Sequence, residues 1–106
     1  MSKYLIQASY GADGMKGVLK EGGTKRKAAV EKAVAGMGGR LESFYYAFGD
    51  VDVFSVVDLP DAVSAAAMSM AISASGLVSI TVTPLLTPED IDKAAKKSVK
   101  YRAPGK

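Results

Sequence analysis

Apolar and polar side chains alternate along four segments of the chain, and this period of two predicts four β-strands. The alternation is clearest near the start, where every second residue from Tyr4 to Tyr10 is apolar while Gln7 and Ser9 fall on the opposite side. Glycine, proline and aspartate separate the segments, as is typical of turns. The predicted strands cover residues 4–10, 40–48, 51–58 and 77–85.

Apolar positions recur at helical spacing between these strands. We predict a short helix over residues 15–21, a longer one over 25–37, one from Pro60 to about residue 75, and a last one over 88–95. Thr24 is the predicted N-cap of the second helix, and Thr87 followed by proline opens the last one. Gly49 and Asp50 predict a tight hairpin turn between the second and third strands.

The predicted order β-α-β-β-α-β, followed by a C-terminal helix, is that of the ferredoxin-like α+β fold. It gives a four-stranded antiparallel sheet with both long helices on one face and the other face uncovered. The helix side is predicted to hold Tyr4, Ile6, Ala8, Val53, Val57, Val78, Ile80 and Val82. The uncovered side is predicted to hold Leu5, Gln7, Ser9, Asp52, Phe54, Val56, Ser79, Thr81 and Thr83.

The uncovered face is too apolar for a monomer. The second predicted strand carries large aromatic side chains on both sides, so either register leaves aromatics exposed beside Phe54 and Val56. Burying about four such side chains gains roughly 6–12 kcal/mol in transfer free energy. We therefore expect a second copy to cover the face, giving a homodimer or higher homo-oligomer of the dimeric α/β-barrel type. The alternative is that the last helix and tail of the same chain cover it.

The composition excludes several kinds of chemistry. The chain has 106 residues and contains no cysteine and no histidine, which removes disulfides, zinc sites built on those residues, thiol nucleophiles and histidine bases. The carboxylates are scattered among strand ends, turns and helix caps, so we expect no metal site. The glycine-rich segment at residues 17–24 lacks the lysine of a phosphate-binding loop, and we expect no cofactor.

The net charge of +3 comes from the C-terminus alone. Residues 1–92 hold eight basic and eleven acidic side chains, whereas residues 93–106 hold six basic and none acidic. We divide the chain into a domain over residues 1–95 and a basic arm over residues 96–106. We interpret the arm first as a strap on a neighbouring subunit and only second as a nucleic-acid contact. No segment is apolar and long enough to cross a membrane, and the start of the chain has no signal-peptide pattern, so we expect a cytoplasmic protein.

Two groups of residues are candidates for binding. An apolar pocket with polar anchors is predicted on the uncovered face, formed by Gln7, Ser9, Phe44, Tyr46, Phe54 and Thr81. An anion is predicted to bind at the start of the second helix, at Thr24, Lys25 and Arg26. For both groups the alternative is a structural role without a ligand. The first group would then fill a subunit interface, and the second would only mark the start of a helix.

Four segments of the chain resemble the GYD domain family: residues 3–10, 44–53, 57–61 and 83–89. The name motif of the family falls on Gly49 and Asp52, and Val51 stands where a tyrosine would be expected. The resemblance implies a small prokaryotic protein with a ferredoxin-like, dimeric α/β-barrel type of fold, and it brings no catalytic residues with it. From the residues themselves, Gly49 permits a turn and Asp52 can accept backbone hydrogen bonds beside it.

These observations favour a non-catalytic oligomeric domain that binds a small ligand or serves in assembly, with itself as partner. The alternative is a cofactor-free enzyme of the dimeric-barrel type, an oxygenase or isomerase acting on a small aromatic or enolic substrate. Its candidate groups are Tyr46, Gln7 and Ser9. An enzyme of this kind needs a proton-transfer group within hydrogen-bond reach of an enclosed substrate, whereas an assembly domain does not.

Overall fold

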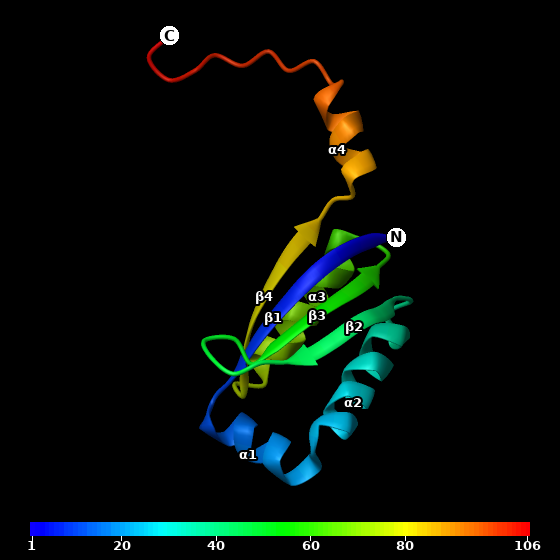
Figure 1. The fold of residues 1–106 in the computed structure, drawn as a ribbon, viewed down its shortest axis with the longest axis vertical. Coiled ribbons are helices and arrows are strands. Elements are labelled where there is room, and N and C mark those ends of the chain that lie inside the picture. The colour runs from blue at the N-terminus through cyan, green and yellow to red at the C-terminus, as the bar shows by residue number, and fades with distance from the viewer.

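A single antiparallel sheet organises the chain (Figure 1). The computed structural model describes all 106 residues. The sheet has the strand order β2-β3-β1-β4. Its strands are β1 (Ser2–Tyr10), β2 (Arg40–Tyr46), β3 (Val53–Leu59) and β4 (Val78–Leu85). The ferredoxin-like α+β fold predicted from the sequence is therefore confirmed.

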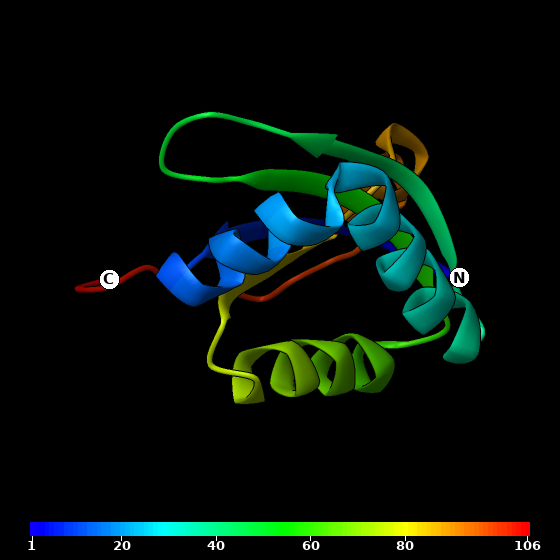
Figure 2. The same ribbon diagram turned by 90° about the horizontal axis from the view of Figure 1, so that it is seen from below.

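Two long helices cover one face of this sheet. They are α2 (Gly23–Gly36) and α3 (Ala62–Ala74), and Figure 2 shows both on the same side of the strands. Two shorter helices complete the fold, α1 (Ala12–Glu21) and α4 (Pro88–Ala95). No helix is both long and apolar enough to span a bilayer.

The core lies between the sheet and the helix layer. Residues of β1 alternate between buried and partly exposed, as their sequence pattern predicts, and β3 repeats the alternation. Leu59, Val34 and Val57 are the largest side chains that are completely buried. The buried apolar residues are Tyr4, Ile6, Ala8, Val34, Val53, Val57, Leu59, Ala65 and Met68. Ile80 and Val82 of β4 pack against this core from the edge.

Helix α1 begins three residues earlier than predicted because a backbone hydrogen bond fixes the chain at its start. The Gly11 N–H donates to the Leu77 carbonyl at 3.0 Å. A Cβ added to Gly14 would collide with that same carbonyl group, so glycine allows α1 to approach the chain just before β4. The two glycines thus extend the helix through a stretch that the sequence pattern assigns to a loop.

The connection between β2 and β3 is wider than the tight turn predicted at Gly49 and Asp50. Strand β2 ends at Tyr46 and β3 begins at Val53, so residues 47–52 form the loop. The Ala47 N–H donates to the Asp52 carbonyl at 2.8 Å and closes it. The prediction that the two strands continue up to a turn at Gly49 and Asp50 is therefore wrong, because the last strand pair is Tyr46 with Val53.

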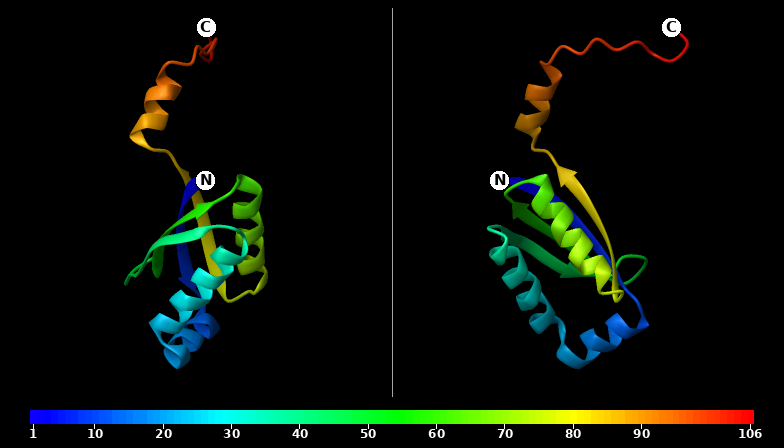
Figure 3. Two further views of the ribbon diagram at one scale, coloured as in Figure 1. Left: turned by 90° about the vertical axis from the view of Figure 1, so that its right-hand side faces the viewer. Right: turned by 180° about the vertical axis from the view of Figure 1, so that it is seen from behind.

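Helix α4 and the basic arm extend away from the rest of the chain (Figures 1 and 3). A capping box fixes the start of α4, where the Asp90 N–H donates to the Thr87 hydroxyl at 3.0 Å and the Thr87 N–H to the Asp90 carboxylate at 3.1 Å. No residue of α4 is buried. The radius of gyration is 16.9 Å, against about 13 Å for a compact chain of this length. The alternative in which this segment covers its own sheet is therefore wrong.

Candidate functional site

The uncovered face of the sheet brings several predicted residues into one row. Gln7 lies opposite Phe54 across the β1–β3 pair and opposite Thr81 across the β1–β4 pair. Tyr45 extends the row, because it pairs with Phe54 across β2–β3. Facing residues in a sheet project to the same side, so these four side chains form a continuous band. Tyr45 is 71% exposed and Phe54 is 38% exposed.

Ser9 lies on the same face, one row further along. It pairs with Ser79, and its hydroxyl donates to the Asp50 carbonyl at 2.7 Å. That bond ties the end of β1 to the loop 47–52. The hydroxyl is therefore already engaged within the chain, and it does not reach the band of Gln7 and Phe54.

Phe44 and Tyr46 lie on the opposite face from the one predicted. They pair with Ser55 and Val53, which are buried under the helices. Their rings meet edge to face with centroids 5.2 Å apart, and the Tyr46 hydroxyl donates to the Gly23 carbonyl at 3.0 Å. The predicted pocket of six residues is consequently divided between the two sides of the sheet.

A β-bulge between Leu41 and Ser43 causes this division. The extra residue reverses the alternation along β2. Leu41 therefore shares the helix side with Phe44 and Tyr46, and Tyr45 is the one aromatic residue of β2 on the uncovered face. The bulge also places Tyr46 on the other side of the sheet from Gln7 and Ser9, so the three candidate groups of the enzyme alternative do not converge.

Four charged side chains close one end of the uncovered face. Lys3 donates to Asp58 at 3.0 Å and to Glu42 at 3.1 Å, and Arg40 donates to the second oxygen of Asp58 at 2.9 Å. The hydrogen bond from Lys3, reinforced by the one from Arg40, lowers the pKa of the nearly buried Asp58 carboxyl below its usual value despite the opposing effect of burial. These partners satisfy each other and leave the middle of the face to the apolar band.

Asp52 fastens the loop 47–52 to the end of β1. Its carboxylate accepts the Tyr10 N–H at 2.8 Å, and its own N–H donates to the Ala8 carbonyl at 2.9 Å. Gly49 has φ of 148° in the same loop, a conformation that favours glycine. Gly49 and Asp52 are therefore both part of the loop.

The start of α2 differs from the predicted anion site. Gly22, with φ of 86°, is the N-cap, and no side chain caps the helix. Thr24 is therefore not the cap, because α1 runs up to Gly22 and the chain turns directly into α2. Thr24 and Lys25 are exposed, and only Arg26 is partly buried. Arg26 turns towards the sheet and faces Glu21 at 3.6 Å.

A surface groove of about 440 Å³ lies between α1 and the loop 47–52. Tyr10 and Tyr46 form its inner wall, and burial raises the pKa of both phenols above the usual value. Both hydroxyls are therefore protonated at neutral pH and serve as hydrogen-bond donors rather than as bases. The sequence pattern places Tyr10 only on the helix side of β1. The signal in the sequence for its place beside the groove is its position as the last residue of the strand, directly before Gly11.

Comparison with known proteins gives one match. A protein-family model described as GYD domain matches residues 4–95, which include the sheet except for the first two residues of β1, all four helices and the loop 47–52, and it ends before residues 96–106. No curated protein and no solved structure matches the chain.

Proposed function

The chain belongs to the GYD domain family, and on this premise we propose that it is a non-catalytic assembly domain that forms a two-fold homodimer through the uncovered face of its sheet. The observation that carries the proposal is the apolar band across that face. Phe54 within the band and Tyr45 at its β2 end remain exposed although helices cover the other side of the same strands. Large apolar patches of this kind on a soluble domain typically mark an interaction surface.

A second copy fits the face in chemistry and shape. Two antiparallel sheets pack face to face about 10 Å apart, with side chains of both inner faces interlocking. The band of Thr81, Gln7, Phe54 and Tyr45 presents two aromatic rings together with one amide and two hydroxyls. In a two-fold dimer it meets a copy of itself, so each aromatic side chain has an apolar surface to pack against.

The size of the face supports a role for the C-terminal segment as well. Seven-residue strands in a four-stranded sheet cover about 23 Å by 19 Å, or roughly 440 Å² in projection. A standard protein interface buries about 800 Å² of accessible surface on each partner, a measure that exceeds the projected area of the same patch. Residues 86–106 carry exposed Leu86, Ile91, Val99 and Tyr101, which can add to the contact area of the face.

Charge favours the same arrangement. Residues 93–106 hold six basic side chains, and none of them forms an ion pair within the chain. Residues 1–92 have a balance of −3. An arm that leaves its own body and carries the opposite charge is suited to lie across the body of a partner subunit.

The test is sedimentation velocity across a concentration series, with Phe54→Asp as the disruptive variant. The exposed part of Phe54 is about 75 Å², so its burial gains about 2 kcal/mol per copy and about 4 kcal/mol per dimer. Its loss should weaken dimerisation about a thousandfold. Met70→Asp is the matched control, because Met70 is an exposed apolar residue on α3, on the other side of the molecule.

A dimeric wild type, a dimeric Met70→Asp variant and a folded, monomeric Phe54→Asp variant would support the proposal. Deletion of residues 96–106 should weaken the dimer without lowering the stability of the monomer, because these residues make no packing contact with the body. A wild-type protein that stays monomeric at millimolar concentration refutes the proposal. So does a Phe54→Asp variant that dimerises as the wild type does.

A further inference from the structure

The layer of helices leaves an apolar cavity above the middle of the sheet. Helix α2 packs mainly on β2 and α3 mainly on β4, and Figure 2 shows the two helices apart over the strands between them. The cavity has a volume of about 60 Å³. Its floor is formed by β1 and β3, one side by Val30 of α2, and the other side by Met68 and Ile72 of α3.

The walls of this cavity are apolar, and its one charged side chain lies at the opening. Eleven of the thirteen lining residues are hydrophobic, and the other two are Ser55 and Arg26. The Ser55 hydroxyl is already engaged, because it donates to the Ser43 carbonyl at 2.8 Å. Arg26 is therefore the one charged side chain that a molecule in the cavity would meet.

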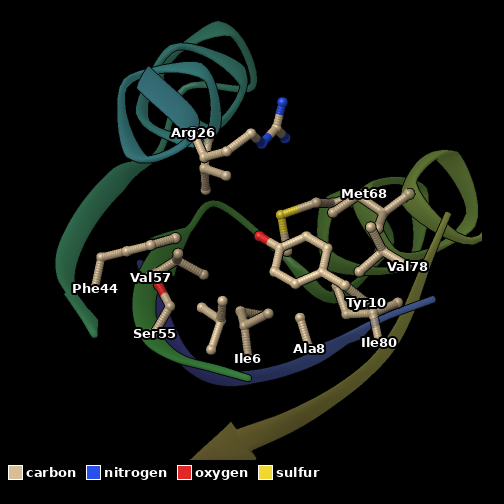
Figure 4. A pocket seen from close by; sticks show the side chains of 13 residues that line it. Ile6, Ala8, Tyr10, Arg26, Phe44, Ser55, Val57, Met68, Val78 and Ile80 are labelled. Carbon is tan, nitrogen blue, oxygen red and sulfur yellow. The ribbon is translucent and has the colours of Figure 1, made fainter. Parts of the chain in front are cut away.

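Two hydrogen-bond donors converge where the cavity opens. Figure 4 shows the Tyr10 ring lying across the space and the Arg26 side chain reaching over it from α2. The Tyr10 hydroxyl donates to no acceptor within the chain, although the peptide N–H of the same residue is bonded to Asp52. Arg26 forms an ion pair with Glu21 at 3.6 Å. Burial raises the pKa of the Tyr10 phenol, and the Arg26 guanidinium lies close enough to its hydroxyl to oppose that rise in part. A guanidinium carries five N–H donors, so at this opening it can also bind an acceptor from outside the chain, together with the phenol.

We propose that this cavity binds a small carboxylic acid with an apolar body, its carboxylate held by Arg26 and Tyr10 and its body against Ile6, Ala8 and Met68. A planar carboxylate matches the fork of a guanidinium, and such charge-assisted bonds are stronger than neutral ones. The volume is less than half of the roughly 150 Å³ of an apolar cavity that holds benzene, so it suits a short branched chain rather than a ring. A surface groove lies on the other side of Tyr10.

This site does not depend on the proposed dimer. It lies within one subunit on the helix side of the sheet, whereas the band of Phe54 lies on the opposite side. The Phe54→Asp variant should therefore bind the same probe as the wild type. Failure of the dimer and failure of the site would be distinguishable by this comparison.

The test is a titration followed by two-dimensional NMR, with sodium isobutyrate as the probe. Isobutyrate should shift the signals of Ile6, Ala8 and Met68 in a saturable manner. Isobutanol has the same branched chain without the carboxylate and should bind more weakly. Inorganic phosphate has the charge without the apolar chain and should leave these signals unchanged.

Variants of the basic residues separate the site from general charge attraction. Arg26→Gln should weaken isobutyrate binding about tenfold or more, and Tyr10→Phe about threefold. Lys25→Gln is the matched control, since Lys25 is the exposed neighbour of Arg26 on the same helix, and it should bind as the wild type does. No saturable shift with isobutyrate, equal binding by Arg26→Gln, or an equal loss in Lys25→Gln would each overturn the proposal.

Discussion

Replacement of Asp52 by alanine tests how the loop 47–52 is held. The variant removes the carboxylate that accepts the Tyr10 N–H at 2.8 Å, while the backbone bonds of Asp52 to Ala8 and Ala47 remain. A hydrogen bond to a charged group contributes about 1.5–3 kcal/mol. For a domain of this size 1 kcal/mol lowers Tm by about 4–8 °C, so we expect a fall of roughly 10 °C.

Thermal unfolding followed by circular dichroism measures this effect. Asp52→Asn keeps an acceptor oxygen, and its Tm should fall by about half as much as that of Asp52→Ala, because a neutral hydrogen bond is about half as strong as one to a charged group. Asp50→Ala is the matched control, since the Asp50 side chain is exposed and only its backbone carbonyl accepts a bond, from Ser9. If the Tm of Asp52→Ala lies within about 2 °C of the wild type, the carboxylate does not stabilise the loop and the reasoning fails.

Four further substitutions test the packing and the ion pairs. Leu59→Ala should lower the free energy of unfolding in urea by about 2–5 kcal/mol, because the side chain is completely buried. Gly14→Ala should lower the free energy of unfolding, since the added Cβ would collide with a backbone carbonyl. Gly17→Ala in the same helix meets nothing within 4 Å and should raise the free energy of unfolding by about 0.5–1 kcal/mol. A Gly14→Ala variant more stable than Gly17→Ala would contradict the close approach of α1 to the chain before β4. The lowered pKa of Asp58, due first to Lys3, means that the carboxylate stabilises the fold above the usual carboxyl pKa and that this contribution is lost as the pH falls through the lowered value. The difference in stability between wild type and Asp58→Asn should accordingly shrink below about pH 4, and a difference that stays constant down to pH 2 would exclude this role.

The sequence predicts β1 well because its alternation continues unbroken into a regular strand. Tyr4, Ile6 and Ala8 are all buried as predicted, and the ends of α4 at Thr87 and Ala95 are confirmed as well. In both places the determinants are local: the side-chain period within a strand, and a cap that reaches three residues along the chain.

The site is harder to predict because its geometry depends on contacts that are distant in the sequence. The bulge beside Leu41 turns Phe44 and Tyr46 to the helix side, and no pattern within β2 marks where the extra residue is accommodated. The sequence predicts Arg26 only as a residue at the start of a helix, yet its environment is created by Tyr10, sixteen positions away, and by α3. Sequence periodicity assigns residues to faces, whereas the spacing of the helices above the sheet follows from packing.

Helix α4 has a consequence for how the C-terminal segment can be observed. It has eight residues and rests on nothing but its capping box. Helices this short are marginal in water unless they pack against a surface, because forming the first turn is costly. The fraction of time for which residues 88–95 are helical therefore depends on what lies against them. Their amide chemical shifts and hydrogen-exchange rates report directly whether the arm is docked, and they do so without any label added to the protein.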